Sequence, residues 1–74
     1  MAFEALLTDD LVRIAAAGGG FRLQAGARTT DDLVRIASAG SRHHCRLIFL
    51  GLGARTTDEI VRISAAGKGS VFFE

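Results

Sequence analysis

One eleven-residue segment occurs three times in this chain and limits its fold more than any other feature. The segment TDDLVRIAAAG begins at Thr8, and it returns as TDDLVRIASAG from Thr30 and as TDEIVRISAAG from Thr57. A repeat length of roughly 20–50 residues is typical of stacked supersecondary units. The sequence therefore predicts a single domain over residues 1–74, built from three units at about 8–29, 30–56 and 57–74.

Each copy has the apolar periodicity of an amphipathic helix about three turns long. Thr56 and Glu59 have the spacing of a capping box before the third copy, and Thr29 with Asp32 resembles one in the second. The first copy lacks a hydroxyl at this place, so we expect a residue at 8–9 to cap it. Helices this short do not persist alone, so their stability must come from packing.

An aspartate near the start of each predicted helix is followed four residues later by an arginine. The pairs are Asp9 and Arg13, Asp31 and Arg35, and Asp58 and Arg62. Because residues four apart are neighbours on a helix, we expect these ion pairs to form within each helix. Each copy closes on a glycine, at positions 18, 40 and 67, where we expect a left-handed C-terminal cap.

A short run rich in apolar and β-prone residues follows each copy, at 21–25, 45–52 and 70–73, and we interpret these runs as strands. A weaker candidate strand at 3–5 precedes the first copy. Strands joined through helices are parallel, and similar units stack in the same sense. We therefore predict an α/β fold: a short one-sided, solenoid-like repeat with a parallel sheet of three or four strands and three helices on one face.

Counting along the strands assigns their side chains to the two faces of the sheet. Aligning the shared GARTT motifs at 26–30 and 53–57 predicts that these residues face the helices: Phe21, Leu23, Ala25, Ile48, Leu50 and Leu52. Counting from the glycines adds Ser70 and Phe72 to that side. Strands alternate, so the uncovered face is expected to carry Arg22, Gln24, Cys45, Leu47, Phe49, Val71 and Phe73.

An uncovered apolar sheet face usually marks an interface. A chain of 74 residues is marginally stable by itself, and the single cysteine rules out an intrachain disulfide. Our main hypothesis is a non-enzymatic protein–protein interaction module that forms a homodimer or higher oligomer through the open face or edge of its sheet. Another bacterial protein is the second partner we consider. The expected interface residues are Cys45, Leu47, Phe49, Val71 and Phe73.

The two GARTT loops suggest an alternative function. They lead from a strand end to a helix start, where anionic ligands often bind, and they would place Arg28 and Arg55 near each other. Asp31 and Asp58 in the adjoining first turns would repel an anion, and the glycine spacing of nucleotide loops is absent. The alternative is therefore a small anionic-ligand binding protein.

Three further classes of function find little support. His43, His44 and Cys45 are adjacent potential metal ligands, but the sequence holds no second cluster, so we expect no metal unless an oligomer brings two together. No catalytic constellation is present, and we expect neither an enzyme nor a cofactor. A net charge of +1 argues against nucleic-acid binding, and no apolar segment is long enough to span a membrane, so we expect a soluble cytoplasmic protein.

The segments LVRIAxAG and AAGKGSVFF give the chain a resemblance to small bacterial α/β-repeat proteins built from two or three such units. The resemblance covers most of the chain and implies the repeat architecture and a bacterial source. It implies no activity and no functional residues. The helix–strand spacing is also similar to that of leucine-rich repeats, but their consensus is missing, so that similarity concerns architecture alone.

Overall fold

The computed structural model describes residues 6–43 and 45–74. The elements are α1 (Thr8–Ala16), β1 (Phe21–Gln24), α2 (Thr30–Ser41), β2 (Leu47–Leu50), α3 (Thr57–Gly67) and β3 (Val71–Phe73). The strands form one parallel sheet in the order β1-β2-β3, which confirms the predicted α/β class. The weaker candidate strand at 3–5 lies outside the described residues.

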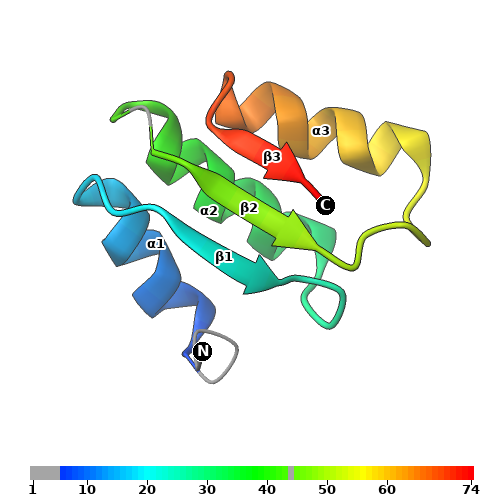
Figure 1. Ribbon diagram of the computed structural model, residues 1–74, viewed down its shortest axis with the longest axis horizontal. Coiled ribbons are helices and arrows are strands. Elements are labelled where there is room, and N and C mark those ends of the chain that lie inside the picture. The colour runs from blue at the N-terminus through cyan, green and yellow to red at the C-terminus, as the bar shows by residue number, and fades with distance from the viewer. Residues whose placement is uncertain (1–5, 44) are drawn as a thin grey trace.

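The fold has two layers, with the sheet in front of the helices in Figure 1. α2 lies between α1 and α3 and contacts both. The core fills the space between the layers, and its largest fully buried side chains come from both. They are Leu11, Leu23, Leu33, Ile36, Leu47, Phe49 and Ile63. The helices of the described chain are all too short to span a bilayer.

The N-terminal caps of α2 and α3 are those predicted from the sequence, whereas the cap of α1 is not. The Thr29 hydroxyl accepts from the Asp32 backbone N–H, and Thr56 forms the full capping box with Glu59. The N-cap of α1 is Leu7, which makes no side-chain cap bond, so the expected cap at 8–9 was wrong. The Thr8 hydroxyl instead forms hydrogen bonds with Arg28 and with Asp32 of α2.

The glycines that end the copies serve mainly in packing, contrary to the expectation of three left-handed caps. Gly18 alone among them has a positive φ, of 95°, whereas α2 continues past Gly40 and Gly67 is the last residue of α3. A Cβ added at Gly40 would lie 2.9 Å from Leu47 Cδ1, which is closer than real contacts allow. Glycine here lets the end of α2 approach the start of β2. The left-handed residue after α3 is Lys68, with φ 50°.

The register of the sheet overturns the predicted faces of β2 and β3. Phe21 pairs with Leu47, and Leu47 pairs with Val71, so odd-numbered residues of β2 share the helix-facing side. Leu47 and Phe49 are fully buried there, while Ile48 and Leu50 are only partly buried on the other side. The predictions for Phe21, Leu23, Ala25, Leu52 and Ser70 were right, since all five are buried.

A single inserted residue, Gly51, explains the error in β2. Gln24 pairs with Leu50, and one residue separates Gln24 from Gly26, whereas Gly51 and Leu52 separate Leu50 from Gly53. Gly51 has φ 81°, a left-handed conformation that glycine adopts without strain. Counting back from the GARTT motif therefore shifts β2 by one position and exchanges its two faces.

Candidate functional site

Three of the expected interface residues belong to the core. Leu47 and Phe49 have 0% exposure, and Cys45 has 5%. The Cys45 thiol donates to the Ala15 carbonyl at 3.2 Å. Their assignment to an open interface was wrong, because the residue inserted at Gly51 turns this strand's large side chains towards the helices.

The outer face of the sheet is a narrow apolar strip with charged margins. Ile48 and Leu50 lie on it partly buried, and Phe72, level with Ile48, is 47% exposed. The Arg46 guanidinium carbon stands 5.5 Å from the centroid of the Phe72 ring, within cation–π range. Arg22 of β1 and Glu74, which follows β3, form an ion pair with a nitrogen–oxygen distance of 2.9 Å. The face carries fewer apolar side chains than the sequence led us to expect.

The edge at β3 exposes the other apolar surface. Within the described residues β3 pairs only with β2. Phe73 is 39% exposed and, with Leu52, Ile60 and Thr57, lines a hollow between β3 and α3. Of the expected interface residues, Phe73 is thus exposed, whereas Val71 is partly buried and packs against the core. No other member of that set lies at this edge.

The two arginines proposed to bind an anion are engaged with protein acceptors. Arg28 donates to the Thr8 hydroxyl at 2.8 Å and to the Leu6 carbonyl at 2.7 Å. Arg55 donates to the Thr30 hydroxyl at 2.6 Å and to the carbonyls of Gly26, at 3.3 Å, and Arg28. Each arginine therefore reaches from the loop before one helix back to the start of the preceding helix. The geometry gives both side chains a role in joining units, and it offers no observation in favour of the anionic-ligand alternative.

A second set of contacts crosses the same boundaries. Arg35 binds Asp9 at 2.7 Å, and Arg62 binds Asp31 at 2.9 Å. The hydrogen bond and charge of Asp9 raise the pKa of Arg35 above its usual value. The predicted pairs within each helix were wrong: Asp9 and Asp31 instead meet the arginine of the following unit, and Asp58 makes no ion pair among the described residues.

The threonine hydroxyls complete each boundary. The Thr8 hydroxyl donates to the Asp32 carboxylate at 3.4 Å, and the Thr30 hydroxyl donates to the Glu59 carboxylate at 3.1 Å. Glu59 also accepts from the backbone N–H of Thr56 at 3.0 Å. These bonds, the one to Thr56 first, lower the pKa of Glu59 below its usual value. The two unit boundaries thus share one set of contacts.

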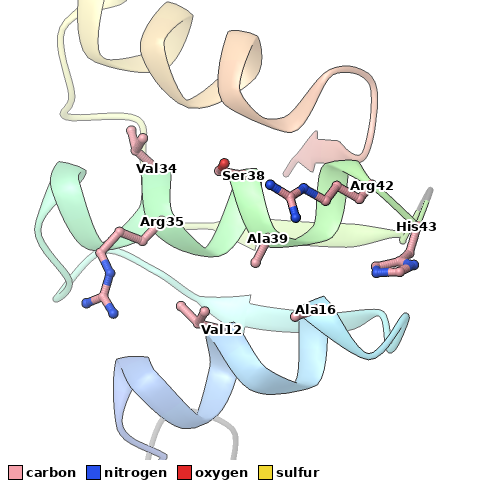
Figure 2. Close-up of a pocket in the computed structure, with 8 residues that line it drawn as sticks. All are labelled: Val12, Ala16, Val34, Arg35, Ser38, Ala39, Arg42 and His43. Atoms are coloured by element: carbon pink, nitrogen blue, oxygen red, sulfur yellow. The ribbon is translucent and has the colours of Figure 1, made fainter.

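A hollow on the outer side of the helix layer lies between α1 and α2, and Figure 2 shows Ala39 on the side of α2 that faces Val12 and Ala16 of α1. Its polar lining residues are Arg35, Ser38, Arg42 and His43. Arg35 is already bound to Asp9. The lining includes no carboxylate to act with His43 in acid–base chemistry. We therefore assign this hollow no chemical role.

The three adjacent potential metal ligands do not form a visible site. Cys45 is buried and bonded to Ala15, while His43 is exposed at the end of α2. His44 lies outside the described residues. Among the residues that are described, no group of three or more potential ligands could hold a metal ion.

Two kinds of surface remain as candidates for function: the β3 edge with the adjoining outer face, and the boundary faces that the first and last units present to solvent. Both consist of contacts already made inside the chain, left incomplete at its ends. No protein-family model, curated protein or solved structure matches this chain.

Proposed function

We propose that this chain is a non-enzymatic interaction module that self-associates through the edge of its sheet and the adjoining outer face. The observation that carries the proposal is the exposure of two phenylalanines on β3. Phe72 is 47% exposed on the outer face, and Phe73 is 39% exposed at the hollow beside α3. An exposed apolar edge strand readily pairs with another chain.

The free energy gained by burying these two rings sets the expected strength of self-association. Burying a whole phenylalanine side chain contributes about 1.5–3 kcal/mol, and the exposed fractions of 47% and 39% together amount to slightly less than one ring. Association costs at least about 4 kcal/mol in lost rigid-body freedom. Main-chain hydrogen bonds along β3 must supply the difference, so the association is weak and depends on concentration.

We further propose that the protein works in the bacterial cytoplasm. Its single cysteine is a buried thiol, which suits a reducing compartment. The same edge is open to a strand from a second bacterial protein, which would compete with self-association. A partner of this kind would bind by adding a strand to the sheet.

The test is the mass of the protein as a function of concentration. Light scattering should give a weight-average mass that rises above the 7.8 kDa of one chain between about 10 µM and 1 mM, the range of weak association. Phe73→Asp should keep the mass at one chain, because it places a charge in the contact. Leu7→Ser is the control, since Leu7 is 72% exposed but lies before α1. A wild-type mass of one chain throughout this range would overturn the proposal.

A further inference from the structure

The chain's two ends present opposite halves of its internal unit boundary. At each boundary the earlier unit supplies a threonine and an aspartate, and the later unit supplies an arginine and a carboxylate on its helix. In the last unit the equivalents of the first pair are Thr57 and Asp58. In the first unit the equivalents of the second pair are Arg13 and Asp10.

Burial at equivalent positions shows that these end faces are less covered than the boundaries inside the chain. Ile36 and Ile63 are fully buried where a unit packs against the one before it, but the equivalent Ile14 is only partly buried. Leu33 is fully buried where a unit packs against the one after it, but the equivalent Ile60 is only partly buried. Each end therefore leaves unfilled a contact that the interior of the chain makes.

The charges on the two faces are complementary. Asp9 and Asp31 each bind the arginine of the next unit, whereas Asp58 is exposed and makes no ion pair among the described residues. Arg13 is likewise exposed and has no carboxylate partner in that part of the chain. Within one chain these two residues lie on the first and last helices, so they can meet only between two chains.

We propose that copies of this chain stack head to tail, with α1 of one copy against α3 of another. Arg13 of one copy binds Asp58 of the next, and Thr57 of that copy donates to Asp10. This inference rests on the proposed self-association and specifies its geometry. The contact between two copies would then repeat the charged and threonine contacts of the two boundaries inside the chain.

The sequence also makes this boundary weaker than the internal ones. Leu6 occupies the place of Arg28 and Arg55, so the guanidinium bonds to threonine and carbonyl oxygens are missing. Ser64 occupies the place of the buried Ala15 and Ala37 on the face of α3. The stack is therefore reversible. A head-to-tail contact leaves one free face at each end of the stack, so further copies can add. The mass therefore rises continuously with concentration instead of stopping at a dimer.

Charge reversal provides the test. Arg13→Asp places a second carboxylate opposite Asp58, and Asp58→Arg places a second guanidinium opposite Arg13, so each variant alone should associate at least about tenfold more weakly than wild type. An equimolar mixture should associate again, because each variant then meets a complementary face on the other. The double variant, R13D with D58R, should associate by itself. Circular dichroism and Tm measured on each variant identify any loss of folding, and recovery in the mixture requires folded chains.

Sedimentation velocity separates the possible results. Loss in both single variants and recovery in the mixture support the stack. Association unchanged by either reversal, yet lost in Phe73→Asp or Phe72→Asp, overturns the head-to-tail geometry and leaves self-association standing. Folded single variants that remain monomeric when mixed overturn it as well. A wild-type chain that stays monomeric overturns both proposals.

Discussion

Arg35 of α2 binds Asp9 of α1 across a distance of 2.7 Å, although Arg13, four residues after Asp9, lies on the same helix. Arg62 and Asp31 repeat the arrangement one unit later, at 2.9 Å. The charged residues of these helices thus connect neighbouring units. Their contribution to stability should differ from that of the loop arginines, Arg28 and Arg55, which bond to less exposed acceptors.

This difference predicts unequal effects for two arginine substitutions at the same boundary. Arg55→Met removes the donors to the Thr30 hydroxyl and to two carbonyls, and should lower the free energy of unfolding by about 1–3 kcal/mol. Arg62→Met breaks one exposed ion pair and should cost less than about 1 kcal/mol. Urea unfolding followed by circular dichroism measures both. Equal effects would show that Arg55 links the neighbouring helices no more strongly than Arg62 does.

Core packing predicts opposite results for two phenylalanines of the sheet. Phe49→Ala should destabilise the chain by about 3–5 kcal/mol, because it empties a fully buried site. Phe72→Ala should cost a dilute chain far less, since that ring is 47% exposed. Thermal and urea unfolding below the concentration of association provide the comparison. A larger loss for Phe72→Ala would restore the faces that the sequence predicted.

The inserted glycine gives a matched pair of backbone tests. Gly51→Ala should destabilise by about 1 kcal/mol or more, because φ is 81° there and an added Cβ would meet the Gln24 side chain. Gly53→Ala is the control: it lies two residues away and has open space around the added Cβ. It should leave stability unchanged or raise it by up to about 1 kcal/mol. Similar Tm values for the two variants would show that Gly51 does not determine the path of the chain.

The capping box predicts how stability depends on pH. The pKa of Glu59 is lowered in the folded chain, so its contribution is present above the usual glutamate value of 4.5 and is lost as the pH falls through the lower folded value. The Tm of wild type should therefore exceed that of Glu59→Gln at pH 7. The gap should narrow as the pH falls below about 4. A gap that does not change between pH 7 and pH 3 would show that the carboxylate form contributes nothing.

The repeat was enough to predict the helices, the strands and the parallel α/β class, because periodicity and capping residues are local signals. The faces of β2 could not be obtained by counting, since a strand alternates every residue and one unpaired residue reverses it. The extra length of the second unit was visible in the sequence. Nothing in the sequence showed that one of its added residues, Gly51, follows the strand.

The candidate site was predicted less well, for a related reason. In a repeat, an aspartate and an arginine recur in every unit, so spacing alone does not tell whether Asp31 binds Arg35 of its own helix or Arg62 of the next. The helix packing decides this. Phe73 was expected on the uncovered face of the sheet, but it lies level with Phe49 on the helix-facing side and is exposed there at the sheet edge, beside Ile60 and Leu52.

The arginine contacts between neighbouring helices all run in one direction, from an arginine on a later helix or in the loop before it to oxygens at the start of the helix before. A gene that duplicated the middle unit, residues 30–56, would encode a longer chain whose additional joint reuses side chains already present on both sides. Its two terminal surfaces would keep their chemistry. Lengthening by duplication and assembly from separate chains would then be two routes to the same extended array.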